Sequence, residues 1–301
     1  MQHRKPLARG LWGVLATPFG EDASTVDDPS VRRQVKLHRA AGSTGLVVLG
    51  VFGEGARLSA PEQDHVVSVV TDEWGDLPIV VGLSALATDE AVEAATRLVG
   101  KVHGGVPSFM VQVNTADPDA LVTHFGAIHE ATGAGIVVQD YPVASGVHIT
   151  SAELVTAVRQ CPFVVAVKSE APPTSAAIAE LSPQLEVPVF GGLGGIGLLD
   201  ELMAGAAGAM TGFSYPEALA SVLQAFDEGG YSAAREKYLP WLPLVNFEAQ
   251  VKIGLGIRKA SLTERGIFSA DSVRPPAPRI VAGLRPLLRE HLAAVRHLGV
   301  M

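Results

Sequence analysis

The sequence predicts an α/β fold, a (β/α)8 barrel of the TIM type with a C-terminal helical extension. Short apolar runs alternate with amphipathic stretches, and eight such strand–helix units follow one another in series. Each unit has about 25 to 30 residues, which favours a closed parallel barrel over an open doubly wound sheet. No Gly-x-Gly-x-x-Gly fingerprint follows the first predicted strand. A chain of 301 residues is long for one domain, but a barrel of this kind uses that length.

The predicted strands are nearly continuous apolar runs, as expected for strands that are buried on both faces. They cover residues 10–17, 45–49, 78–82, 106–111, 135–139, 163–168, 187–191 and 208–211. The predicted helices are amphipathic; Gly42 and Ser43 end the first, and Ser59 with Pro61 opens the second. These helices cover residues 30–41, a segment from 59, and 88–102, 118–130, 150–160, 175–181, 196–204 and 216–226.

The pattern changes after the eighth unit. Three further helical stretches are predicted at residues 231–247, 250–264 and 280–297, with a proline-rich linker at 275–278. This part of the chain is too small to bury a core of its own. We therefore expect a barrel at residues 1–228 and an extension at 229–301, which packs on the barrel or on a neighbouring subunit.

Composition narrows the classes of function. The hydrophobic fraction is 48% against 18% charged residues, so a large core is expected. The net charge is −8 and no basic block is present, which makes nucleic acid an unexpected partner. The single cysteine, Cys161, is interpreted as a buried structural thiol, and the histidines show no metal-ligand spacing. No apolar segment reaches the length of a membrane span, so we expect a soluble, cytoplasmic protein without metal or cofactor.

The sixth predicted strand leads directly into Lys168. A lysine at this place is either a surface residue or a desolvated amine suited to forming a Schiff base. In a barrel, side chains at the carboxyl ends of the strands face the active site. Lys168 is the one lysine among those ends, which carry Thr17, Gly50–Glu54, Ser84, Gln112, Asn114, Gln139–Pro142, Lys168, Glu170, Thr211 and Phe213.

A glycine-rich run, 191–197, follows the seventh predicted strand. Barrels often hold an anion on backbone N–H groups at this point, and Gly191 is accordingly a candidate substrate-binding residue. A tight loop that only crosses the rim is an equally good interpretation.

Four motifs are spread along the chain: Gly13-x-x-x-Thr17-Pro18-Phe19, the Gly-x-x-Gly-Glu loop that ends at Glu54, Leu58-Ser-x-x-Glu62 and the Val-x-x-Lys168 strand. Together they resemble the dihydrodipicolinate synthase/N-acetylneuraminate lyase family. The resemblance implies a Schiff base between Lys168 and a 2-oxo acid substrate. It also implies a class I aldolase, lyase or dehydratase that assembles as a dimer or tetramer.

The departures from the family pattern narrow the choice. The usual hydroxyl residues are replaced by Val51 and Phe52, the usual catalytic tyrosine by Gln139, and the arginine that the synthase uses for its aldehyde substrate by Ala144. Dihydrodipicolinate synthesis is therefore not expected. Five motifs resemble the branch of L-2-keto-3-deoxyarabonate dehydratases: Val51-Phe-Gly-Glu54, Gln139-Asp-Tyr-Pro142, Lys168-x-Glu170, Gly208-Ala-Met-Thr-Gly212 and Gly254-Leu-Gly-Ile-Arg-Lys259.

The branch implies that Lys168 condenses with the C2 ketone of a 2-oxo-3-deoxy sugar acid, after which a base removes a C3 proton and the C4 hydroxyl departs. Glu170 is the first candidate for the base, because the strand pleat points it the same way as Lys168. The alternative is that it only pairs with the ammonium. Gln139 is expected to bind the carboxylate or leaving hydroxyl, and Tyr141 either donates a proton or packs on the rim.

Four other positions complete the expected site. Backbone N–H groups of Val51 and Phe52 are expected to hold the substrate carboxylate. Thr17 and Thr211 are candidate substrate-binding residues at strand ends, whereas Glu54 is expected to anchor its loop. Two alternatives to dehydration stay open: a pyruvate-dependent aldolase or lyase that also uses Lys168, and a non-catalytic barrel that binds a 2-oxo acid.

Overall fold

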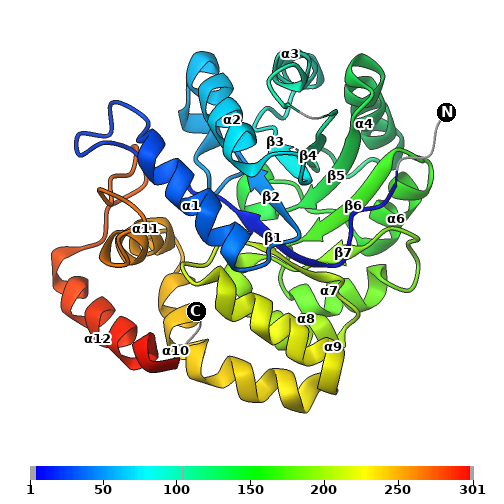
Figure 1. Ribbon diagram of the computed structural model, residues 1–301. Coiled ribbons are helices and arrows are strands. Elements are labelled where there is room, and N and C mark those ends of the chain that lie inside the picture. Colours follow the sequence, from blue (N-terminus) through cyan, green and yellow to red (C-terminus); the bar gives the residue numbers. More distant parts are fainter. Residues whose placement is uncertain (1–4, 104, 299–301) are drawn as a thin grey trace.

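The computed structural model describes residues 5–103 and 105–298, and its eight strands form one parallel sheet that closes into a barrel (Figure 1). The order is β7-β6-β5-β4-β3-β2-β1-β8. A bridge between Gly191 and Ala209 closes the seam between β7 and β8. The predicted (β/α)8 barrel is confirmed. The strands are β1 Gly10–Val14, β2 Gly45–Val48, β3 Ile79–Gly82, β4 Ser108–Gln112, β5 Gly135–Asp140, β6 Val164–Ser169, β7 Val189–Phe190 and β8 Gly208–Thr211.

Helices alternate with the strands and surround the sheet (Figure 1). The predicted start of the second helix is confirmed, since Ser59 and Glu62 form a capping box there. Around the barrel lie α1 Asp28–Ala40, α2 Ala60–Trp74, α3 Thr88–Val99, α4 Pro118–Thr132, α5 Pro142–Ser145, α6 Ser151–Arg159, α7 Thr174–Leu181, α8 Leu198–Met203 and α9 Pro216–Tyr238. The C-terminal helices are α10 Leu242–Glu248, α11 Gly254–Glu264 and α12 Arg285–Val295.

Several predicted boundaries were wrong. Strand β1 ends at Val14 rather than at Thr17, because the chain leaves the sheet and the Thr17 hydroxyl donates to Gly53 O. The helix predicted at 231–247 is interrupted by a 3-10 turn at Leu239–Trp241, since Pro240 has no N–H to continue an α-helical ladder. The last helix begins at Arg285, later than the predicted 280.

Two apolar layers hold the barrel. Inside it, Trp12 meets Phe190 edge to face at 6.4 Å between ring centroids. A larger cluster fills the space between the sheet and helices α1 to α4, α6 and α7. The interior layer therefore makes the barrel a packed core, open to chemistry only at the strand ends. It consists of Trp12, Val14, Val47, Val80, Met110, Val137, Val165, Ala166, Phe190, Ala207 and Met210.

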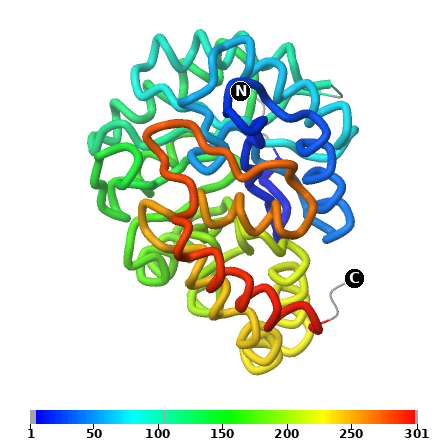
Figure 2. Tube along the Cα trace, turned by 90° about the vertical axis from the view of Figure 1, so that its left-hand side faces the viewer, coloured from blue at the N-terminus to red at the C-terminus, as the bar shows by residue number. Residues whose placement is uncertain are grey.

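The C-terminal helices share a core with the last barrel helices. One cluster joins Leu198 of α8 and Leu219 of α9 to Leu244 of α10, Ile257 of α11 and Leu288 of α12. The chain after α11 then returns to the N-terminal part of the barrel, as the orange segment beside the blue one in Figure 2 shows. The C-terminal part thus packs on the barrel over a wide area.

A buried ion pair fixes that return. Lys259 of α11 is 0% exposed, and its Nζ donates to the Glu54 carboxylate and to Ser272 O (2.9 Å). The Arg274 N–H donates to the other oxygen of Glu54 (2.9 Å), and its guanidinium binds Glu62. Burial lowers the pKa of Lys259 to about 8, whereas Glu54 acts in the opposite direction.

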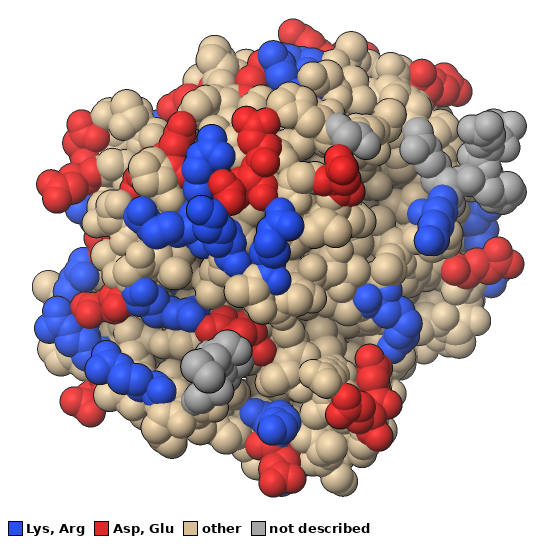
Figure 3. Space-filling model, viewed as in Figure 1, with Lys and Arg blue, Asp and Glu red and all other residues tan. Residues whose placement is uncertain are grey.

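Charge on the surface is mixed. On the face drawn in Figure 3, Lys and Arg lie interspersed with Asp and Glu. Over the residues that the structure describes, no helix combines the length and the apolar composition that crossing a membrane requires.

His38 packs α1 against β1. A Cβ on Gly13 would lie 2.2 Å from His38 Nδ1, so the ring rests directly on the glycine backbone. The same nitrogen lies 3.0 Å from the Ser43 hydroxyl. Burial lowers the pKa of His38 to about 3, and the charge of Arg265 acts in the same direction. The folded protein therefore holds this imidazole neutral.

We expect His38 to make the protein acid-sensitive. Between pH 6.5 and 3 the unfolded chain binds a proton at this residue that the folded chain does not, so stability falls as pH falls. The slope that His38 contributes is about 1.4 kcal/mol per pH unit. Urea unfolding across this range should show a shallower slope for His38→Gln than for the wild type. The exposed His65→Gln serves as control, and equal slopes for wild type and His38→Gln would contradict the prediction.

Removing one member of the buried pair should be costly. Lys259→Met leaves Glu54 buried without its cation, and we expect a loss of about 3 to 5 kcal/mol in the free energy of unfolding. Adding Glu54→Gln should recover part of that loss, because no uncompensated charge then remains. Arg289→Met breaks the exposed pair with Glu264 and should cost about 1 kcal/mol or less. Equal losses for Lys259→Met and Arg289→Met in urea unfolding would refute this account.

Candidate active site

Three polar side chains meet at the carboxyl ends of β5 and β6. The two strands pair in parallel, and after a register shift between Ile136 and Val137, Gln139 lies opposite Lys168. Lys168 Nζ lies 2.9 Å from Glu170 Oε2, and Gln139 Nε2 donates to the same oxygen at 2.6 Å. Each of the three residues is buried, at 5% exposed or less. The contact expected between Lys168 and Glu170 is thus present, while their chemical roles stay predictions.

The glycine loop after β7 encloses the other side of Glu170. Leu193 N–H donates to Glu170 Oε1 at 3.1 Å. A Cβ on Gly192 would lie 2.2 Å from the same oxygen, so this approach requires a glycine. The anion that this loop holds is therefore the protein's own carboxylate.

The two candidate residues at the β7–β8 side are used within the protein. Gly191 N–H donates to Gly208 O at 3.3 Å as part of the barrel seam. The Thr211 hydroxyl accepts from Gly194 N–H at 2.8 Å, which leaves its own proton available to a ligand. Substrate binding by Gly191 and Thr211 stays a prediction, and Thr211 is the better placed of the two.

The loop after β2 supplies free donors. Within the part of the chain that the structure describes, the N–H groups of Val51 and Phe52 have no acceptor. Two contacts fix the position of this loop: the Thr17 hydroxyl donates to Gly53 O (2.7 Å), and Glu54 pairs with Lys259. Unused N–H groups on a fixed turn are suited to binding a carboxylate.

Tyr141 borders the cluster from the end of β5. It is the residue before α5, and it is partly buried. Burial raises the pKa of its phenol and the negative charge of Glu170 raises it further, whereas Arg258 lowers it. The phenol therefore keeps its proton in the neutral pH range and could donate it.

Arg258 is a site residue that the sequence interpretation missed. It lies on α11, far along the chain from every strand end. In the fold its guanidinium carbon nevertheless lies 5.0 Å from the centroid of the Phe52 ring. A Cβ on Gly194 would lie 2.2 Å from Arg258 Nη2, so the group also rests on the glycine loop. Burial lowers the pKa of Arg258, and Glu248 acts in the opposite direction. The only sequence signal was the resemblance of the segment 254–259.

Two further carboxyls lie behind the cluster. Burial raises the pKa of Asp140 to about 6, and Asp140 Oδ1 has no partner among the described residues. Burial raises the pKa of Glu201 to about 7, and this side chain accepts from the Thr174 hydroxyl at 2.7 Å. The charge of Glu170 contributes to both increases, which places both carboxyls within its electrostatic reach.

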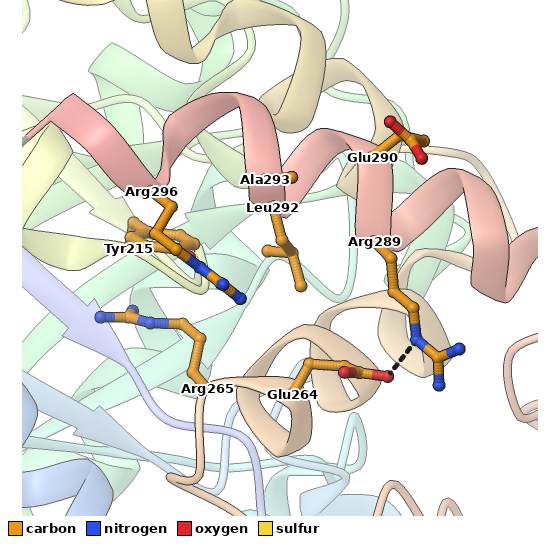
Figure 4. A pocket seen from close by; sticks show the side chains of 8 residues that line it. All are labelled: Tyr215, Glu264, Arg265, Arg289, Glu290, Leu292, Ala293 and Arg296. Carbon is orange, nitrogen blue, oxygen red and sulfur yellow. Dashed lines mark hydrogen bonds and ion pairs between the residues drawn. The ribbon is translucent and has the colours of Figure 1, made fainter.

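A separate surface cleft lies between α11 and α12 (Figure 4). Its volume is about 450 Å³, and an ion pair between Arg289 and Glu264 spans part of it. It contains none of the barrel's strand ends, so it is distinct from the Lys168 cluster. Its lining consists of Tyr215, Glu264, Arg265, Arg289, Glu290, Leu292, Ala293 and Arg296.

Among the described residues, no group of three or more His, Cys, Asp or Glu could hold a metal ion.

Comparison with known proteins gives a consistent family. The Dihydrodipicolinate synthetase family profile matches residues 7–294. An L-2-keto-3-deoxyarabonate dehydratase of Azospirillum brasilense is 30% identical, over 96% of this chain and 94% of that protein. A 4-hydroxy-tetrahydrodipicolinate synthase of Methanothrix thermoacetophila is 28% identical, over 79% of this chain and 80% of that protein.

A solved structure agrees with the sequence relatives. The crystal structure of dihydrodipicolinate synthase from Rhodopseudomonas palustris superposes with a TM-score of 0.88 at 27% identity, covering 98% of this chain and 100% of that one. The motifs around Lys168 thus belong to a relationship that extends over the whole barrel and the C-terminal helices. The chain belongs to the dihydrodipicolinate synthetase family and is an enzyme of the lyase class.

Proposed function

We propose that the protein is a Schiff-base-forming lyase that dehydrates a 2-oxo-3-deoxy sugar acid of the 2-keto-3-deoxyarabonate kind. The observation that carries the proposal is the buried contact of Lys168 and Gln139 with one oxygen of Glu170. Lys168 supplies the amine and Glu170 the base. Gln139, which stands where the family's synthases have a tyrosine, supplies a hydrogen-bond donor. The dehydratase of Azospirillum brasilense, 30% identical over nearly the whole chain, supports the same class of reaction.

The reaction begins at Lys168 Nζ. Glu170 Oε2, at 2.9 Å, can take the proton of the ammonium, which leaves the neutral amine that attacks the C2 ketone. Loss of one water gives an iminium, and the free N–H groups of Val51 and Phe52 hold the substrate carboxylate during this step. The iminium then acidifies the C3 protons, because it can accept the electron pair that is left behind.

Glu170 removes a C3 proton in the next step, and the C4 hydroxyl leaves as water once it is protonated. Tyr141 is the proposed donor of that proton, since its phenol stays protonated beside Glu170. Gln139 holds the carboxylate of Glu170 in one orientation through its 2.6 Å bond. The C3=C4 double bond formed in this way becomes the C4=C5 enol of an aldehyde when a C5 proton is transferred to C3. Hydrolysis of the iminium then consumes the water released at the start, so the net change is the loss of one water.

The remaining expectations belong to the same proposal. We propose a cytoplasmic homo-oligomer, a dimer or a tetramer, that binds a small 2-oxo acid and needs no cofactor. Sedimentation of the purified protein at several concentrations would give the size of the assembly.

We expect borohydride to trap substrate on Lys168. Intact-mass measurement after incubation with pyruvate or 2-keto-3-deoxyarabonate and reduction should show one adduct per chain, located on Lys168. Lys168→Met should form no adduct, whereas Lys101→Met, at a half-buried lysine that pairs with Asp64, should label like the wild type. Wild-type protein that never labels would refute the Schiff base and favour a non-catalytic barrel. Release of 2-oxoglutarate semialdehyde marks dehydration, and release of pyruvate from the sugar acid marks aldol cleavage instead.

Glu170→Gln should separate trapping from turnover. The glutamine keeps the shape of the side chain but accepts a proton neither from the Lys168 ammonium nor from C3. We therefore expect the adduct to form more slowly but still to reach one per chain, while dehydration slows much further, by about 100-fold or more. The dehydration rate of Glu170→Asp should lie between the rates of the wild type and Glu170→Gln. Glu153→Gln, in the capping box of α6, should behave like the wild type. If Glu170→Gln reduces labelling and turnover to the same extent, Glu170 serves to pair with Lys168 and is not the base.

A further inference from the structure

Arg258 is a partly buried cation that makes no hydrogen bond with the described residues. Its side chain is 13% exposed, and among the described residues the guanidinium makes no hydrogen bond; its Nε is buried without a partner. The nearest carboxylate oxygen recorded, Glu248 Oε2, is 4.0 Å from Nε. A guanidinium carries five N–H donors, and donors buried in a folded protein nearly always have partners. The missing acceptors are therefore expected from a ligand.

The surroundings of Arg258 place it at the mouth of the barrel. One face of the guanidinium covers the Phe52 ring, in the loop after β2. Gly194, in the loop after β7, lies against Nη2. The charge of Arg258 acts on Tyr141 at the end of β5, and the charge of Glu170 acts on Arg258. The guanidinium thus borders the loops that surround Lys168 on three sides, from a helix that lies outside the barrel.

Other groups already serve the reactive end of the substrate. The N–H groups of Val51 and Phe52 are free to hold the C1 carboxylate, and Lys168 takes the C2 ketone. Arg258 comes from α11 and not from a strand end, and its guanidinium carbon lies 5.0 Å from the centroid of the Phe52 ring. Its position therefore suits the part of the substrate beyond C3. Glu248 Oε2 lies 4.0 Å from Arg258 Nε and already compensates part of the positive charge of the guanidinium. The ligand group therefore needs to accept hydrogen bonds but need not carry a charge.

We infer that Arg258 is the specificity-determining residue for the substrate's tail, and that it selects an uncharged, hydroxyl-bearing tail of a 2-oxo acid of five or more carbons. This inference rests on the proposed function. It predicts that the protein distinguishes such acids from pyruvate, which has no tail, and from 2-oxoglutarate, which ends in a second carboxylate.

The test compares initial rates of borohydride trapping at low substrate concentration for pyruvate, 2-keto-3-deoxyarabonate and 2-oxoglutarate. For Arg258→Met we expect labelling by 2-keto-3-deoxyarabonate to fall by about tenfold or more, and labelling by pyruvate to stay within about twofold of the wild type. Arg258→Lys should restore part of the loss, because it keeps the charge but not the planar fork. The wild type should label more slowly with 2-oxoglutarate than with the sugar acid.

Controls make each outcome decisive. Arg289→Met, at an exposed arginine, should leave all three rates unchanged, and thermal unfolding should show that the Arg258 variants are folded. A loss in Arg258→Met that is equal for pyruvate and the sugar acid, or no loss for either, overturns the inference while the Schiff base stands. Preference of the wild type for 2-oxoglutarate overturns the choice of an uncharged tail. Wild-type protein that labels with none of the three acids refutes the proposed function, and the inference with it.

Discussion

The buried pair of Lys259 and Glu54 is the interaction on which the rest of the site depends. It joins α11, near the end of the chain, to the loop after β2 that presents the free N–H groups of Val51 and Phe52. Arg258 is the neighbour of Lys259 on the same helix, so the pair that fixes the loop also brings the guanidinium over Phe52. An ion pair buried this completely tolerates little displacement, because each charge has lost its water. The C-terminal helices are therefore part of the site's construction.

A second constraint is the set of contacts that fixes the carboxylate of Glu170. Its carboxylate receives a hydrogen bond from Gln139 on one side and from Leu193 N–H on the other, while Lys168 lies against one of its oxygens. The glycine loop that would otherwise bind an external anion is used to hold this internal one. Burial raises the pKa of Asp140 to about 6 and that of Glu201 to about 7, and the negative charge of Glu170 contributes to both increases. The carboxylate is thus positioned from all sides before any substrate arrives.

The sequence determined the barrel, most strand ends and the contact between Lys168 and Glu170. These follow from local rules: eight apolar runs at a regular spacing, and a pleat that points alternate residues the same way. Two predicted boundaries were wrong for different reasons. The Thr17 hydroxyl makes a long-range hydrogen bond to Gly53 O, and Pro240 interrupts the helix before α10. The short helix α5 after Tyr141 was not anticipated either.

Only the tertiary structure decided which partners those residues have. No periodicity relates Arg258 or Lys259 to the strand ends, since 205 residues separate Lys259 from Glu54. The glycine run after β7 was compatible with an anion site or with a plain loop, and its place beside Glu170 shows that it binds the protein's own carboxylate. A sequence specifies which chemical groups the strand ends carry, because strand direction and pleat are local properties. It does not specify which distant helix covers them, because that choice is made by packing over the whole chain.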